Sequence, residues 1–377
     1  MLAIVNGKVI VDQSVEKKVV LIEGDRILDI CNTVPDEAEI IDAQGQYVSP
    51  GFIDIHIHGC NGFDIMTNTY ESLMNISRFL LSTGVTGFLA TTMTESSGKI
   101  RETIWEANRA SCNVCGADIL GIHMEGPFIS FQYKGAQNPG YIEKPSVESF
   151  RKKCGEDEEF VKVVTLAPEL EGAHELIEYL KERNIVASMG HTNADYEEAE
   201  KAIGWGVKSS THTFNGMKGF IHREPGALGA VMDSDIMAEI IADGVHVHPA
   251  ALRILARLKG FENLILVTDS MMAAGMVDGQ YTLGGQKVNV KNGVARVISG
   301  QLAGSTLTMN RAVRNVKEFL NITVPQAVAM AAGNPARLLE LKDRGVLAKG
   351  CIADIIIFNE DIRVTRVIKS GIDMGVY

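Results

Sequence analysis

The feature that most constrains the fold is an alternation of short apolar runs and amphipathic segments between residues 49 and 340. Helical periodicity appears at Tyr70–Ser82, Ile100–Ser111, Ala173–Arg183, Tyr196–Gly204 and Pro249–Leu258. Apolar runs typical of buried parallel strands lie around these segments, at Phe52–His58, Val85–Thr92, Ile119–Glu125, Val161–Ala167, Ile185–His191, Ser209–Thr213, Ala238–Asp243 and Leu264–Asp269. Eight such strands with intervening helices predict an α/β chain folded as a (β/α)8 TIM barrel. A doubly wound open sheet is the alternative, which is weakened because no G-x-G-x-x-G sequence follows the first strand.

Both ends of the chain carry a different pattern, in which short β-type runs alternate with Gly and Asp turns. The pattern occupies residues 1–48 and returns in residues 341–377. Chain ends often lie close together, so we expect these two parts to form one small β-sandwich domain beside the barrel domain at 49–340. Two unrelated appendages are the alternative.

The charge balance limits the classes of partner. The 377 residues carry a formal net charge of -11. Nucleic acids and anionic membranes require a basic surface, so neither is expected as a partner, although one local basic pocket could still bind phosphate. The N-terminal residues lack the features of a signal peptide, and no apolar run reaches 18 residues. We therefore expect a cytoplasmic protein.

Two histidines stand at the end of the first predicted barrel strand. His56 and His58 are two residues apart, so their side chains share one face of the strand, which is the interior in a barrel. Two neutral imidazoles at this spacing can converge on one metal ion. An H-x-H pair is a weak motif by itself, and two buried, hydrogen-bonded histidines would be equally consistent with it.

Further polar residues occupy the ends of other predicted strands. Glu125, His191, His212 and Asp269 stand at the ends of the third, fifth, sixth and eighth predicted strands. Barrel active sites lie at the carboxyl ends of the strands, so we expect these side chains to meet His56 there. His123 lies one layer deeper, and we interpret it as structural. A divalent metal held by such a cluster would lower the pKa of a bound water, and Asp269 would move a proton from the attacking water to the leaving amine.

These motifs together resemble the amidohydrolase superfamily and, within it, the N-acetylglucosamine-6-phosphate deacetylases. The resemblance covers essentially the whole chain. It rests on the segments Pro50–Gly59, His123–Phe128, Gly190–Thr192, His212–Met217, Arg223–Gly226, Asp243–His246, Val267–Asp269 and Asn334–Ala336.

The resemblance implies hydrolysis of the acetyl group of a sugar 6-phosphate, with Asp269 as acid and base. It implies that Glu125, His191 and His212 hold the main metal ion. Because His56 and His58 are both present, a second ion bridged by Glu125 is expected, which gives one or two divalent ions per subunit. Many superfamily members bridge two metals with a carboxylated lysine after strand 4, and the segment Thr165–Glu169 has none. Zinc is the preferred metal, with iron, manganese, cobalt or nickel as alternatives.

The resemblance also implies substrate contacts. His246 would contact the sugar, and Asn215 and Gly216 would meet the phosphate, partly through backbone N–H groups. Arg223 would bind the phosphate of the neighbouring active site, which implies a homodimer. A solvated loop charge is the alternative for Arg223.

One residue departs from the family pattern. The family usually has a histidine that polarises the acetyl carbonyl at the position of Gln137. An amide can donate a hydrogen bond but carries no positive charge. Gln137 therefore either takes a neutral version of that role, leaves it to the second metal, or indicates a different substrate such as the galactosamine isomer.

Two other interpretations of the function remain open. One is another amidohydrolase activity, either hydrolysis of a cyclic amide or deamination. The residues expected to bind phosphate argue against it. The other is a non-catalytic relative, against which the retention of Asp269 and the histidines argues.

Overall fold

The computed structural model describes residues 1–377 and contains the predicted barrel. Eight parallel strands form one sheet in the order β17-β16-β15-β14-β13-β12-β11-β8. The sheet closes where Ile57 bridges Ser270 and the backbone N–H of His58 donates to the carbonyl of Ser270. The strands are β8 (Phe52–Ile57), β11 (Val85–Thr92), β12 (Asp118–Glu125), β13 (Val161–Leu166), β14 (Val186–Met189), β15 (Val207–Ser210), β16 (Met237–Ile240) and β17 (Leu264–Leu266).

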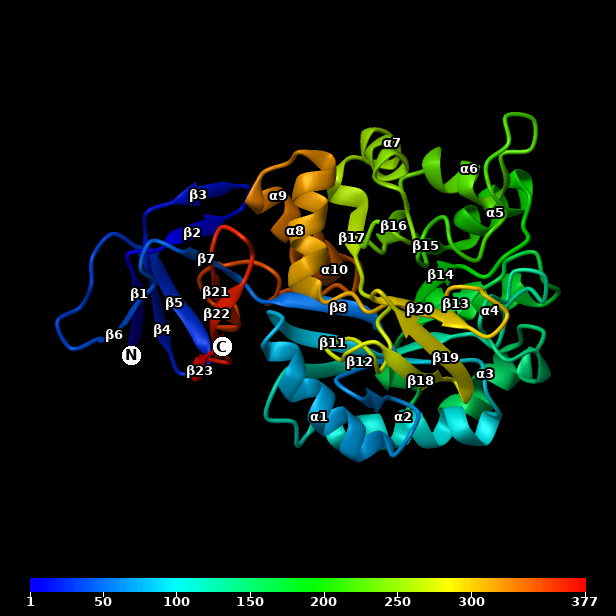
Figure 1. The fold of residues 1–377 in the computed structure, drawn as a ribbon, viewed down its shortest axis with the longest axis horizontal. Helices are drawn as coiled ribbons and strands as arrows, with labels where there is room; N and C mark the ends of the chain where they lie inside the picture. The colour runs from blue at the N-terminus through cyan, green and yellow to red at the C-terminus, as the bar shows by residue number, and fades with distance from the viewer.

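The helices predicted from periodicity are confirmed, and they pack around the strands (Figure 1). They are α1 (Thr69–Leu81), α2 (Ser97–Ser111), α4 (Ala173–Glu182), α5 (Tyr196–Trp205) and α7 (Pro249–Lys259). Other helices were not anticipated, namely α3 (Val147–Cys154), α6 (Gly226–Met232), α8 (Met309–Leu320), α9 (Val324–Ala331), α10 (Gly333–Leu338) and the single turns η1 (Pro139–Tyr141), η2 (Glu158–Phe160) and η3 (Phe261–Asn263). Helices α8 to α10 pack against β8 and β17, the two strands at which the barrel closes.

The two ends of the chain lie together at one side of the barrel (Figure 1). A four-stranded sheet has the order β5-β4-β1-β6, and a six-stranded sheet β23-β22-β21-β7-β2-β3 joins strands from both ends. Their bounds are β1 (Leu2–Val5), β2 (Lys8–Val11), β3 (Ser14–Glu16), β4 (Val19–Glu23), β5 (Arg26–Cys31), β6 (Glu39–Asp42), β7 (Tyr47–Pro50), β21 (Ile355–Phe358), β22 (Val364–Lys369) and β23 (Ile372–Val376). Residues of both sheets share one hydrophobic cluster, as in a sandwich.

A cluster of ion pairs connects the end strands to the amino-terminal side of the barrel. Asp118, the first residue of β12, accepts hydrogen bonds from Arg344 at 2.6 Å and from Lys369 of β22 at 2.8 Å. Asp354 contacts the same two cations. Because these side chains are largely buried, the cluster fixes the end strands against the barrel.

A small three-stranded sheet that was not predicted follows β17. It consists of β18 (Gly279–Leu283), β19 (Gln286–Lys291) and β20 (Val294–Val297). Its two turns, Gly284-Gly285 and Asn292-Gly293, have positive φ at both residues, which is the type I′ geometry that joins tight hairpins. A second small sheet, β9 (Gly59–Cys60) with β10 (Phe63–Asp64), follows β8. No helix of the structure combines the length and the apolar composition that crossing a membrane would require.

Candidate metal centre and active site

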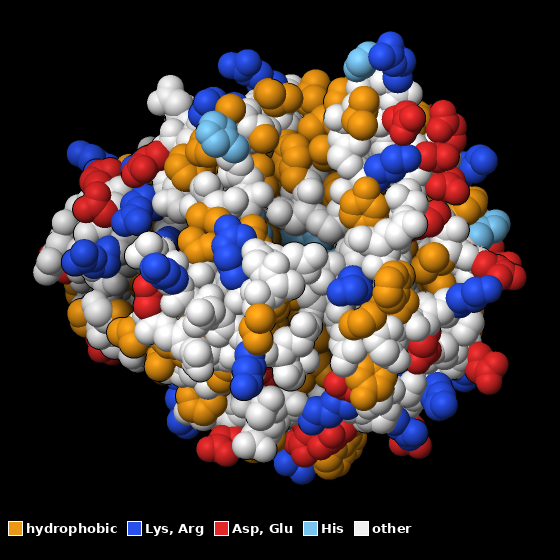
Figure 2. Space-filling model, turned by 45° about the vertical axis from the view of Figure 1, so that its right-hand side comes forward, with side chains coloured by type: hydrophobic (Ala, Val, Ile, Leu, Met, Phe, Trp, Pro, Cys, Tyr) orange, Lys and Arg blue, Asp and Glu red, His pale blue; other side chains and the backbone are white.

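A cavity of about 360 Å³ opens at the carboxyl ends of the barrel strands. Its size falls within the range of small-molecule sites. In Figure 2 it is the hollow near the middle of the face, with pale-blue histidine atoms at its base. Leu283 of the small sheet and the following Gln301 and Leu302 form part of its wall. The predicted site residues among its lining are His58, Glu125, Gln137, His191, His212, Asn215, Gly216, His246 and Asp269.

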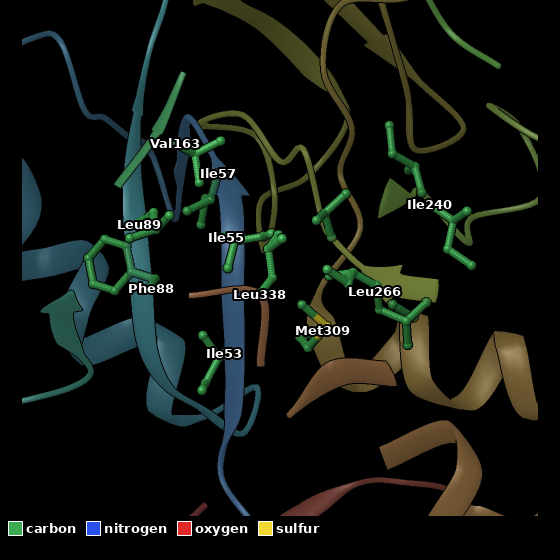
Figure 3. Packing of buried hydrophobic residues seen from close by; sticks show 14 of the residues in the cluster. Ile53, Ile55, Ile57, Phe88, Leu89, Val163, Ile240, Leu266, Met309 and Leu338 are labelled. Carbon is green, nitrogen blue, oxygen red and sulfur yellow. The ribbon is translucent and has the colours of Figure 1, made fainter. Parts of the chain in front are cut away.

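Strand β8 shows how the sequence directs its polar side chains into the barrel. Ile53, Ile55 and Ile57 alternate with polar residues, and Figure 3 shows the three isoleucines in the hydrophobic packing. The alternation leaves His56 on the opposite, interior face, where it is fully buried.

The closest group of candidate metal ligands comes from the end of β12 and from the segments that follow β14 and β15. Oε1 of Glu125 lies 3.0 Å from Nε2 of His191 and 3.0 Å from Nε2 of His212, and the two Nε2 atoms are 3.1 Å apart. Two nitrogens bound to one tetrahedral zinc at about 2.0 to 2.1 Å are roughly 3.3 Å apart. The three ligand atoms therefore have the mutual spacing that a shared cation requires.

A second group adjoins the first. Oε2 of Glu125 lies 3.3 Å from Nε2 of His58, and Oε1 lies 3.6 Å from Nε2 of His56. Nε2 of His56 is buried without any hydrogen-bond partner. An unpartnered imidazole nitrogen beside a carboxylate is a donor arrangement that binds metal ions, so this set also fits a divalent metal. Glu125 is the one side chain shared by both groups.

The ring nitrogens of these histidines have fixed roles. Nδ1 of His58, His191 and His212 lies 3.2, 2.8 and 3.1 Å from the backbone carbonyls of Thr91, Tyr133 and Asn215, respectively. A carbonyl only accepts, so each Nδ1 carries the proton and each Nε2 offers its lone pair to the centre. In His123 both nitrogens are engaged, with the carbonyl of Ile55 and the hydroxyl of Thr165, which agrees with its expected structural role.

Three candidate residues lie just beyond the strands that were predicted to contain them. The predicted strands extend to His191, Thr213 and Asp269, but β14, β15 and β17 end at Met189, Ser210 and Leu266. His191, His212 and Asp269 have φ of 48°, 30° and 45°. Such left-handed backbone costs of order 1 to 3 kcal/mol per residue and is typical of functional sites. It turns the three side chains towards the mouth of the barrel.

The two carboxyl groups of the centre have lowered pKa values. Burial alone would raise the pKa of Asp269, but His56, His58 and His212 nearby lower it to about 2. Glu125, although buried, likewise has a pKa well below its usual value because of the surrounding histidines. Both carboxyl groups are therefore ionised at neutral pH, as metal binding requires.

The predicted substrate residues differ in their placement. His246 is held by a 2.7 Å hydrogen bond from its Nδ1 to Asp243. A Cβ at Gly216 (φ 58°) would lie 3.0 Å from Nδ1 of His191, so glycine permits the close approach of this loop. Gln137 donates from Nε2 to Oε2 of Glu125 at 2.6 Å and accepts from the N–H of Thr94.

Arg223 is the predicted site residue that the structure does not bring to this cavity. It lies on an exposed loop with Phe220 and Ile221. It is not among the residues that line the cavity of its own chain.

Glu239, in the middle of β16, is a buried polar residue of the site that was not predicted. It is fully buried, and its Oε2 lies 3.1 Å from Nδ1 of His56. The signal available in the sequence was an acidic residue within an otherwise apolar strand, where a charge requires a buried partner.

Comparison with known proteins decides the family. The model of the amidohydrolase family matches residues 47–372. This chain belongs to the amidohydrolase family. An N-acetylglucosamine-6-phosphate deacetylase of Bacillus subtilis (strain 168) is 41% identical to this chain over 344 residues. The match covers 89% of this chain and 87% of the relative. An N-acetylgalactosamine-6-phosphate deacetylase of Escherichia coli O157:H7 is 36% identical over 340 residues, covering 89% of this chain and 90% of the relative.

Solved amidohydrolase structures agree with the sequence comparison. A mutant N-acetyl-D-glucosamine-6-phosphate deacetylase of Mycobacterium smegmatis, in complex with N-acetyl-D-glucosamine-6-phosphate, superposes with a TM-score of 0.93 at 31% identity. The similarity covers 100% of this chain and 99% of that chain. The predicted family and fold class are thereby confirmed.

Proposed function

We propose that this amidohydrolase removes the acetyl group from N-acetylglucosamine 6-phosphate to give glucosamine 6-phosphate and acetate. The observation that carries the proposal is the meeting of Glu125, His191 and His212 with Asp269 in one cavity. The similarity to deacetylases named for this substrate supports the choice of sugar phosphate.

The cofactor in this proposal is one or two divalent metal ions. Glu125, His191 and His212 would hold the first ion, and His56, His58 and the second oxygen of Glu125 would hold the other. Zinc suits the imidazole and carboxylate donors best, with iron, manganese, cobalt and nickel as alternatives. When bound, a divalent cation lowers the pKa of a water towards neutrality and withdraws electron density from a carbonyl oxygen.

Asp269 would move the proton in this reaction. Its carboxylate, ionised and 3.3 Å from Nε2 of His58, lies beside the proposed metal ligands and lines the cavity. It accepts a proton from the attacking water as the new carbon–oxygen bond forms. It then donates that proton to the sugar nitrogen as the carbon–nitrogen bond breaks, which balances the hydrolysis.

The remaining cavity residues would hold the sugar phosphate. His246 offers Nε2 to a sugar hydroxyl because its Nδ1 is occupied by Asp243. Asn215 and Gly216 would meet the phosphate. Gln137 already donates to Glu125, so we assign the polarisation of the acetyl carbonyl to the metal rather than to this amide.

Arg223 would complete the phosphate site from a second copy of the chain. The exposed fractions of Phe220 and Ile221, 55% and 57%, support a contact surface on the loop that carries Arg223. The proposed assembly is a homodimer in which each Arg223 reaches the neighbouring cavity.

Acetate release from purified, metal-loaded protein tests this function. Both hexosamine 6-phosphates belong in the assay, because one relative is named for the galactosamine isomer. The proposal expects a higher kcat/KM for the glucosamine compound. Preference for the galactosamine compound would reassign the substrate, and ammonia release from nucleobases without acetate release would reject deacetylation.

A further inference from the structure

We propose that Glu239 is a positioning residue that holds His56 and His212 in place for metal binding. The inference rests on the proposed metal-dependent function, and it concerns a side chain outside the ligand set assigned above. Glu239 projects from the middle of β16 into the barrel and has no exposed surface.

The contact with His56 sets the role of each ring nitrogen. Oε2 of Glu239 accepts from Nδ1 of His56 at 3.1 Å. The opposite nitrogen, Nε2, then carries the lone pair and lies 3.6 Å from Glu125. A carboxylate behind a ligating histidine fixes its tautomer and orientation and increases its basicity.

The contact with His212 acts through the backbone. The N–H of His212 donates to the same Oε2 at 3.2 Å, and the N–H of Thr213 donates to the backbone carbonyl of Glu239 at 2.8 Å. His212 has φ of 30°, a conformation that non-glycine residues rarely adopt. Glu239 thus stabilises the left-handed turn that directs this imidazole to the centre, and one carboxylate supports a ligand from each of the two groups.

Glu239 could instead be a metal ligand itself, since its carboxylate lies near His56 and His123. The hydrogen bonds argue against this role. Both nitrogens of His123 are engaged with Ile55 and Thr165, so neither has a lone pair to offer on that side. A cation there would also have to displace the proton on Nδ1 of His56.

The carboxylate of Glu239 has hydrogen-bond donors on one of its two oxygens. Its Oε1 is buried and has no hydrogen-bond partner. No Lys or Arg is among the residues that line the cavity, which include the carboxylates of Glu125 and Asp269. Burying a carboxylate is costly, so the positive charge of a divalent ion bound by His56 would stabilise Glu239 behind it.

Metal titration of Glu239→Gln and Glu239→Leu tests the inference. Metal-depleted wild type and variants are titrated with Zn²⁺ against a chromophoric chelator, and with Co²⁺ by visible absorption. Loss of an outer carboxylate typically weakens metal binding 10- to 100-fold. We expect the dissociation constant of at least one ion to rise by this factor in both variants, with the larger change in the Leu variant and an altered Co²⁺ spectrum.

The matched control is Glu143→Gln, which removes a carboxylate charge from the ion pair with the buried Lys153. It should bind metal as the wild type does. If the Leu variant fails to fold, the nearly isosteric Gln variant decides. A folded Gln variant with the metal affinity and the Co²⁺ spectrum of the wild type would overturn the positioning role of Glu239. Acetate release by the wild type is measured separately. If the wild type does not hydrolyse the proposed substrate, the comparison of metal binding still tests the role of Glu239.

Discussion

Nε2 of His58 lies 3.3 Å from Oδ1 of Asp269, although His58 follows the first barrel strand, β8, and Asp269 follows the last, β17. The barrel closes between β8 and β17, and this closure brings them together: the N–H of Asp269 donates to the carbonyl of His56 at 2.8 Å. The proposed proton-transfer group is therefore fixed directly against the proposed metal ligands.

Asp269→Asn should retain bound metal and lose most of its activity. The amide keeps the shape of the side chain but cannot accept a proton from water. General acid–base groups typically contribute 10²- to 10⁴-fold, so we expect kcat to fall by about that factor. Acetate release measured together with elemental analysis of the same preparation tests this, and near-normal turnover would remove Asp269 from its assigned role.

Arg223→Ala should impair binding of the phosphate group specifically. We expect KM for N-acetylglucosamine 6-phosphate to rise by at least about tenfold, since a charge-assisted hydrogen bond contributes 1.5 to 3 kcal/mol. KM for the unphosphorylated sugar should change little. The control is Arg363→Ala, an exposed arginine beside the end strands. Equal effects on both sugars would contradict the phosphate assignment.

Arg344→Met should destabilise the protein without altering the active site. Removing one partner of a buried ion pair costs roughly 3 to 5 kcal/mol, and the remaining Lys369 should reduce the loss to about 2 to 3 kcal/mol. Lys144→Met is the matched control, because the pair Lys144–Glu171 is exposed and should contribute less than about 1 kcal/mol. Denaturant unfolding compares the two variants, and equal losses would show that the cluster does not fix the end strands.

Lys259 should make stability depend on pH in the alkaline range. Burial lowers the pKa of Lys259 from 10.5 to about 8. Between pH about 8 and 10.5 the unfolded chain binds a proton that the folded chain does not. The free energy of unfolding therefore rises with pH across this range and is lowest below it. At about 1.4 kcal/mol per pKa unit, the gain is up to about 3 kcal/mol.

Comparison with Lys259→Met isolates that effect. The variant leaves the carbonyls of Val231 and Ser234 without their donor but cannot titrate. Urea unfolding at a series of pH values from 7 to 11 should show wild type gaining stability relative to this variant, whereas Lys349→Met, an exposed control, should follow wild type. A constant difference between wild type and Lys259→Met would contradict the assignment.

The barrel could be predicted from sequence because its strands are continuous apolar runs that only a fully buried parallel sheet accommodates. Glu125 and the H-x-H pair were found because polar side chains at strand ends must have a partner. The limits of the strands could not be predicted, because His191, His212 and Asp269 adopt a left-handed backbone that propensity disfavours.

Glu239 could not be assigned from its sequence position. Its partners, His56 and the backbone of His212, are distant in the chain and meet it only through closure of the barrel. The sheet β18–β20 was not predicted for a different reason. Its Gly-Gly and Asn-Gly turns can be seen in the sequence, but the segment follows the last barrel strand and does not fit the alternation of strands and helices.

Metal dependence of acetate release tests the account most directly. Protein depleted of metal with a chelator and then dialysed should release no acetate from N-acetylglucosamine 6-phosphate, and Zn²⁺ should restore release with one glucosamine 6-phosphate formed per acetate. Unchanged acetate release by protein whose metal content is shown by elemental analysis to be negligible would contradict the account, as would a fully metal-loaded protein inactive on both hexosamine 6-phosphates.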